Sequence, residues 1–190
     1  MSTPYSGAPT TQAPPTPIYV GLDLSLTSTG VATIHGDIVT VRRVASKATQ
    51  GDTSDTAARL DRVVAEILGS IPLTEHTHVA IEGPSYGSVG FGQHVRGGLW
   101  WLVRTELARA GVDTIIAAPS TVKKYATGKG NAGKDAVLAA VVKRYADVEV
   151  TGNDEADALV LAAICARRAG APIEESLPAV QAEAVAAVTR

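Results

Sequence analysis

Two aspartates open an otherwise apolar helix near the end of the sequence. The stretch VTGNDEADALVLAAICARR, residues 150–168, places Asp154 and Asp157 in the first turn of the expected helix, and residues three apart share one helix face. Acidic side chains in a first turn complement the helix dipole, which accounts for Asp154. Asp157 directly precedes ALVLAAICA. We expect it to face the interior, where an unpaired charge is costly and a bound cation would stabilise it.

Two further carboxylates belong to predicted strands. Asp23 interrupts the apolar run in YVGLDLSLTSTG, and Glu82 ends the strand in THVAIEGPS. Taken alone, Asp23 could be a solvent-facing strand residue. Glu82 lies at the carboxyl end of its strand, where ligands of open α/β sheets bind. With Asp154 and Asp157 these residues would form an oxygen-only site, which suits Mg²⁺ or Mn²⁺ better than zinc. Two such ions would activate water and stabilise the leaving oxygen of a phosphodiester, so the pattern predicts nuclease chemistry.

The elements that must position these carboxylates alternate along the chain. Apolar runs separated by turn signals predict three meandering strands over 18–44, and helical spacing predicts a helix from an N-cap at Thr53, Ser54 or Asp55 to Leu68. A strand ending at Glu82, a helix over 98–110, a strand over 112–117 and helices over 132–145 and 154–169 follow. This order predicts an α/β fold: a mixed sheet with helices on its faces.

The expected domain organisation is simple. Residues 1–17 are rich in proline and carry no charged side chain, which predicts a disordered leader. A single nuclease domain is expected over 18–170, followed by an acidic tail or short helix over 171–190. The single cysteine, Cys165, favours a reducing, cytoplasmic location, and no membrane span is expected.

A basic segment is concealed by the formal net charge of −2. Residues 121–145 hold Lys123, Lys124, Lys129 and Lys134, which we expect to contact DNA phosphates. Lys134 is placed closest to the scissile phosphate, where it could stabilise developing charge. The alternative is a flexible, solvated loop. In the glycine-rich loop that follows Glu82, Tyr86 or Phe91 could stack on unpaired bases, or both rings could anchor the loop to the core.

Four blocks together resemble a known family: VGLDLSLTSTGVA, HVAIEGPSYG, TVKKYATGKGNAGKDAV and DEADALVLAA. In this order and spacing they resemble RuvC-type Holliday junction resolvases of the RNase H-like superfamily. The resemblance implies an RNase H-like fold with a mixed five-stranded sheet, three antiparallel meander strands plus two parallel strands, and helices on both faces. It also implies that Asp23, Glu82, Asp154 and Asp157 are metal ligands and that Lys123 and Lys134 contact DNA or assist catalysis.

The activity implied by the resemblance is resolution of four-way junctions by paired nicks. Such enzymes act as homodimers with two Mg²⁺ or Mn²⁺ ions per active site and leave 5′-phosphate and 3′-hydroxyl ends. The sequence departs from the pattern at Leu24-Ser25, where many relatives carry Pro-Gly. The helix containing Trp100 and Trp101 could supply the dimer contact, or both rings could be buried within one protomer.

Three other functions remain compatible with parts of the pattern. The same nuclease chemistry could act mainly on forks, flaps or other branched DNA, since a fold does not fix branch preference. GLDLSLTSTG also resembles the phosphate-binding hairpin of actin-like ATPases and sugar kinases, which leaves Asp154, Asp157 and the lysines unexplained. A non-catalytic junction binder would normally lack some of the four carboxylates.

Overall fold

The computed structural model describes residues 15–48, 51–84 and 91–190. Its centre is a five-stranded sheet of β1 (Ile18–Asp23), β2 (Ser28–His35), β3 (Ile38–Ala45), β4 (Thr77–Glu82) and β5 (Asp113–Ala117), in the order β3-β2-β1-β4-β5. The β1–β2 and β2–β3 pairs are antiparallel, whereas β1–β4 and β4–β5 are parallel. The predicted combination of a three-stranded meander and two parallel strands is confirmed.

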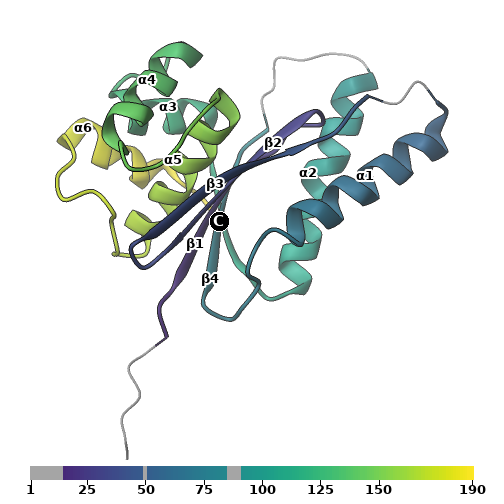
Figure 1. Cartoon of the computed structure of the whole chain (residues 1–190), viewed down its shortest axis with the longest axis horizontal. Helices are drawn as coiled ribbons and strands as arrows, with labels where there is room; N and C mark the ends of the chain where they lie inside the picture. Colours follow the sequence, from purple (N-terminus) through teal and green to yellow (C-terminus); the bar gives the residue numbers. More distant parts are fainter. Residues whose placement is uncertain (1–14, 49–50, 85–90) are drawn as a thin grey trace, which may run out of the picture.

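Helices cover both faces of the sheet (Figure 1). One layer holds α1 (Thr53–Leu68) and α2 (Phe91–Arg109). The other holds α3 (Pro119–Thr127), α4 (Lys134–Arg144), α5 (Asn153–Arg168), α6 (Ala179–Ala182) and the 3₁₀ helix η1 (Glu183–Ala187). Each layer encloses its own buried apolar cluster, because alternate strand residues face opposite sides.

The starts of helices α1, α2 and α4 differ from the predicted ones. The N-cap of α1 is Asp52, which accepts hydrogen bonds from the backbone N–H groups of Ser54 and Asp55. Helix α2 begins at Phe91, seven residues before the predicted start at 98, and α4 begins at Lys134 and not at 132. Helix α3 was not predicted at all. Residues 121–127 of the basic segment therefore belong to a helix, in which Tyr125 is fully buried.

Helix α5 packs unusually close to the sheet because two strand residues lack side chains. A Cβ placed on Gly21 of β1 would lie 2.0 Å from the carbonyl oxygen of Ala158, and one placed on Gly30 of β2 would lie 1.9 Å from that of Asp154. Glycine inside a strand commonly marks such a backbone approach. The contact presses nearly the whole of α5 into the core.

Residues 171–190 pack onto the α3–α5 layer. The Glu174 carboxylate accepts hydrogen bonds from the hydroxyls of Tyr125 (2.8 Å) and Tyr145 (2.5 Å), and Arg167 Nη2 donates to it at 3.0 Å. Near the end of the chain, Thr189 pairs with Ile116 through two backbone hydrogen bonds. Among the described residues, no helix has the length and apolar character needed to cross a membrane.

Candidate active site

The sheet register brings the predicted carboxylates to one edge. Asp23 ends β1 and Glu82 ends the neighbouring parallel strand β4, so both lie at the carboxyl edge of the sheet. Gly30 is the ladder partner of Asp23 and lies directly beneath the Asp154 backbone. The start of α5, which carries Asp154 and Asp157, is therefore held over this same edge. Four side chains separated by up to 134 positions in the sequence thus meet at one end of the fold.

Burial and mutual repulsion raise the pKa values of three of these carboxyl groups. Burial raises the pKa of Asp23 to about 8, and the negative charges of Glu82 and Asp157 add to the rise. Burial likewise raises the pKa of Glu82 to about 7, with Asp157 as the main repelling charge. The pKa of Asp157 rises to about 6, again mainly through burial. Carboxyl groups whose pKa values are strongly raised by burial and by a nearby charge are typical of functional sites.

A hydrogen bond links Asp23 and Glu82. It raises the pKa of Asp23 and lowers that of Glu82. Among the described residues, no three His, Cys, Asp or Glu side chains are already arranged to hold a metal ion. A divalent cation held by these carboxylates would favour their ionised forms. The all-oxygen donor set suits a hard divalent ion, and an ion would relieve the repulsion between the carboxylates.

Two of the predicted lysines act on these carboxylates. The positive charges of Lys123 on α3 and Lys134 at the start of α4 lower the pKa values of both Glu82 and Asp157. Both cations therefore lie near the carboxylate edge, as their predicted role requires. Lys129 is exposed on the loop between α3 and α4, and Lys124 is half-buried on α3.

The structure does not describe the side chains of Tyr86 and Phe91, the two aromatic residues that could stack on bases. Tyr86 lies outside the described residues. Phe91 is the first residue of α2, but its side chain also falls outside the described part. Both roles remain predictions.

The two adjacent tryptophans of α2 face different surroundings. Trp100 Nε1 donates a hydrogen bond of 3.0 Å to the backbone carbonyl oxygen of Glu82. Trp101 is 66% exposed, and its ring meets that of Trp100 edge-on at 4.9 Å. Both rings line a cavity of about 530 Å³ next to Glu82. Trp100 thus ties α2 to a candidate metal ligand, a role that the sequence pattern did not reveal.

The loop after Asp23 is held by residues that the sequence analysis did not assign to the site. Arg59 of α1 is buried and donates to Ser46 Oγ (2.9 Å) and to the Leu26 carbonyl oxygen. Ser25 forms a local turn, since its hydroxyl accepts from Thr27 N at 3.4 Å. Within the described chain no acidic side chain forms an ion pair with Arg59, so this guanidinium is satisfied by neutral acceptors.

Glu155 is rotated about 100° from Asp154 around α5, which predicts a side chain in solvent, but the side chain is buried. It is only 7% exposed and accepts hydrogen bonds from Thr151 N (2.6 Å) and Thr151 Oγ1 (2.8 Å). Its other oxygen lies 3.4 Å from Arg43 Nε of β3. The N-cap residue Gly152 has no side chain to bind free N–H groups, so Glu155 turns back to satisfy the entering chain.

The raised carboxyl pKa values predict how the metal-free protein responds to pH. Folding raises these pKa values above those of the unfolded chain, so the folded state binds protons more tightly between about pH 4 and pH 8. The resulting stabilisation is complete below the pKa values that the carboxyl groups have in the unfolded chain. It is lost as pH rises through their pKa values in the folded protein. We expect the unfolding temperature in EDTA to fall between pH 5 and pH 8. Calorimetry would measure it, and excess Mg²⁺ should reverse most of the loss at pH 8; a flat EDTA profile would contradict the mutual repulsion.

Comparison with known proteins first defines the class. The fold is similar to the structure described as T. thermophilus RuvC in complex with Holliday junction substrate, with a TM-score of 0.63 and 22% identity over 81% of this chain and 96% of that chain. A second structure, described as Thermus thermophilus RuvC, matches with a TM-score of 0.55 and 20% identity. The α/β fold is therefore RNase H-like, as predicted.

The family follows from the sequence comparisons. Residues 19–166 match the family model described as Crossover junction endodeoxyribonuclease RuvC. Proteins of that description from Rickettsia prowazekii (strain Madrid E) and Rickettsia rickettsii (strain Sheila Smith) are each 27% identical over 157 residues, covering 78% of this chain and 96% of theirs. The chain belongs to the RuvC family. It is a divalent-metal-dependent nuclease of the class that resolves Holliday junctions.

Proposed function

We propose that the chain is a homodimeric resolvase that nicks four-way DNA junctions in pairs, using two Mg²⁺ or Mn²⁺ ions at Asp23, Glu82, Asp154 and Asp157. The observation that carries this proposal is the meeting of these carboxylates at one sheet edge within a family match over 19–166. The expected products carry 5′-phosphate and 3′-hydroxyl ends. The similar T. thermophilus RuvC structure, which is a complex with Holliday junction substrate, supports the choice of a four-way junction.

The chain's own residues support distinct parts of such a reaction. Divalent ions, when bound, would supply an activated water and charge stabilisation at the leaving oxygen. Asp23 and Glu82 hold the sheet side of the site, while Asp154 and Asp157 hold the helix side. Lys134, whose charge already acts on Asp157, would stabilise negative charge that develops on the scissile phosphate.

A homodimer would place two such sites on the two strands to be cut. The exposed indole of Trp101, beside Leu102 at 38% exposure, supports α2 as the surface between protomers. Trp100, which is bonded to the Glu82 carbonyl group, would then connect this surface with the active site. We also propose a cytoplasmic location, because buried Cys165 has no disulfide partner within the chain.

A panel of labelled substrates tests the proposed specificity. Wild type and Asp23→Asn are incubated with four-way junction, fork, flap and linear duplex in Mg²⁺. We expect paired nicks in the four-way junction, at least about 100-fold slower cutting of linear duplex, and no cutting by Asp23→Asn, because loss of one electrostatic group commonly costs about 10²–10³-fold in rate. Equal cutting of forks and four-way junctions would defeat the resolvase proposal and favour a broader branched-DNA nuclease. Cutting by Asp23→Asn at the wild-type rate would show that Asp23 is not a ligand.

A further inference from the structure

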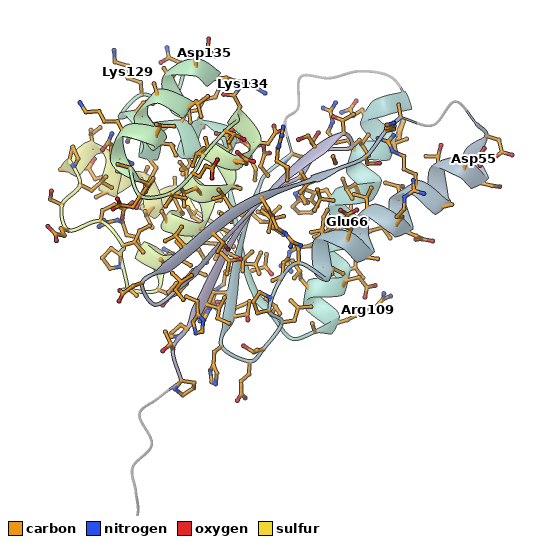
Figure 2. All side chains as sticks on the ribbon, in the orientation of Figure 1. Asp55, Glu66, Arg109, Lys129, Lys134 and Asp135 are labelled. Carbon is orange, nitrogen blue, oxygen red and sulfur yellow. The ribbon has the colours of Figure 1, made fainter. Side chains whose placement is uncertain are left out.

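A groove on the outer side of the α3–α4 layer is separate from the carboxylate edge. It has a volume of about 600 Å³, and its lining includes Lys129, Lys143 and Arg144. Figure 2 shows Lys134 on the side of this layer nearer α2 and Lys129 on the side away from it. The lysines that act on the carboxylates are Lys123 and Lys134. The basic segment therefore divides into a group at the site and a second group that the proposed chemistry does not use.

The positive charge of this groove is not neutralised within the described chain. No lysine there lies within ion-pair distance of an acidic side chain, and Arg144 forms no ion pair either. The lining residues include no aspartate or glutamate. Lys129 and Lys143 are both exposed, so their ammonium groups are available to a ligand.

The floor of the groove is built from inward-facing hydrogen bonds. Arg144 donates to the carbonyl oxygens of Tyr125 (3.2 Å) and Ala126 (2.7 Å) and to Gln181 Oε1 (3.1 Å). The Gln181 amide in turn donates to Ala126 at 3.2 Å. Both polar floor residues are thus engaged with the protein, which leaves the two lysines as the outward donors.

Small side chains form the walls of the groove. They are Ala126, Ala132, Ala136, Ala140 and Thr127, whose hydroxyl donates to the Lys123 carbonyl oxygen at 2.8 Å. Such walls allow a bulky chain to approach, yet they offer no hydrogen-bond pattern that could read a base edge. Charge without base-reading groups fits a sugar–phosphate backbone, which is recognised by position and not by sequence.

We propose that the α3–α4 groove binds the phosphate backbone of a duplex arm of the junction, with Lys129 and Lys143 as its two cationic contacts. This inference rests on the proposed junction-cleaving function and adds Lys143 to the DNA-binding residues. The groove holds the arm, while Lys123 and Lys134 serve the phosphate at the carboxylates. Gln181 belongs to the segment beyond the family match at residue 166, so this chain completes the groove with residues outside the shared family region.

The first test separates binding from chemistry. Junction binding is titrated in Ca²⁺ over a range of salt for wild type, Lys129→Ala, Lys143→Ala and the double variant. Each lost phosphate contact should flatten the slope of log K against log salt by about 0.9, so the double variant should lose about 1.8. Single-turnover cleavage at saturating junction should stay at the wild-type rate in the double variant and fall in Lys134→Ala. An unchanged slope, or a fall in the saturated rate of the double variant, would overturn the proposal.

Two controls test the assignment to a duplex arm: a variant that removes a cation elsewhere, and junctions with shorter arms. Arg109→Ala removes a cation at the far end of α2, where Arg109 pairs with Glu106, and should leave the slope unchanged. Junctions with progressively shortened arms should lose the difference between wild type and the double variant, because the groove then has no backbone to hold. A difference that persists at the shortest arms would overturn the assignment to an arm.

The experiments distinguish failure of the proposed DNA-binding groove from failure of the proposed junction cleavage. If wild type cuts no junction, the proposed function fails, whereas normal cutting with an unchanged salt slope defeats the groove alone. An acidic polypeptide that binds the wild type and not the double variant, while junction binding is equal for both, would assign the groove to an acidic protein partner instead of DNA.

Discussion

Asp157→Asn should abolish junction cleavage and leave junction binding intact or tighter. Asp157 lies at the carboxylate edge, and its charge raises the pKa values of both Asp23 and Glu82. An amide keeps the shape of the side chain but removes a negatively charged ligand. We expect the cleavage rate to fall by about 10²–10³-fold or more, the range for loss of one preorganised electrostatic group. Binding should not weaken, because a negative charge near the phosphate backbone is removed.

The same substitution should stabilise the metal-free protein. Without the Asp157 charge, Asp23 and Glu82 ionise with less repulsion, so the unfolding temperature in EDTA at pH 8 should rise above that of wild type. Single-turnover cleavage, junction titration in Ca²⁺ and calorimetry in EDTA measure the three effects. Glu66→Gln is the matched control, an exposed carboxylate of α1 in the other helix layer (Figure 2), and should change none of them. Cleavage by Asp157→Asn at the wild-type rate would show that Asp157 does not belong to the active site.

Strand patterning carried most of the information that sequence could give about this fold. Alternating apolar residues and turn signals identified the meander, and Glu82 at a strand end marked the edge where ligands bind. Asp157 attracted attention because a charge stood next to an apolar run. These signals are local. Because β1 and β4 are parallel neighbours, their carboxyl ends lie at the same edge of the sheet, which brings Asp23 and Glu82 together.

The errors arose where tertiary contacts override local preference. Helix α3 is only nine residues long, and it is stabilised by burial of Val122 and Tyr125, which its local pattern did not disclose. Glycines in the first part of α2 suggested a loop, because each costs about 1 kcal/mol relative to alanine in a helix interior. Glu155 was placed in solvent by helix rotation alone, whereas its hydrogen bonds with Thr151 draw it inward.

Contacts between distant segments had no sequence signal of their own. The bond from Trp100 to the Glu82 carbonyl oxygen and the bond from Arg59 to the loop after Asp23 both depend on how α1 and α2 lie on the sheet. The glycines of β1 and β2 did carry a usable signal, since glycine inside a strand marks close backbone approach. With that signal, the placement of α5 over Asp23 could have been predicted.

Gly30→Ala should displace the start of α5 and destroy the candidate site. The added Cβ would lie 1.9 Å from the Asp154 carbonyl oxygen, 2.5 Å from its carbonyl carbon and 3.1 Å from Ala158 Cβ. The first two obstacles are backbone atoms of a buried helix, which cannot yield as the end of a flexible side chain would. We expect a loss of at least about 1–3 kcal/mol in the free energy of unfolding, the usual cost of overpacking. Because the contact falls on Asp154 itself, cleavage should drop by about 10²-fold or more even in the folded protein.

Substitutions at two other glycines distinguish displacement of α5 at Asp154 from a general loss of stability. Gly97→Ala in α2 meets no atom within 4 Å and should raise the stability by up to about 1 kcal/mol, so it controls for the alanine itself in thermal unfolding. Gly21→Ala meets the Ala158 carbonyl oxygen at 2.0 Å, one helical turn beyond Asp154, and should be destabilising as well. Well below their unfolding temperatures, Gly30→Ala should be the slower enzyme per folded molecule, since it moves the helix at the carboxylates. Equal rates for the two variants would mean that Asp154 acts through the packing of α5 as a whole and not through its position over Asp23.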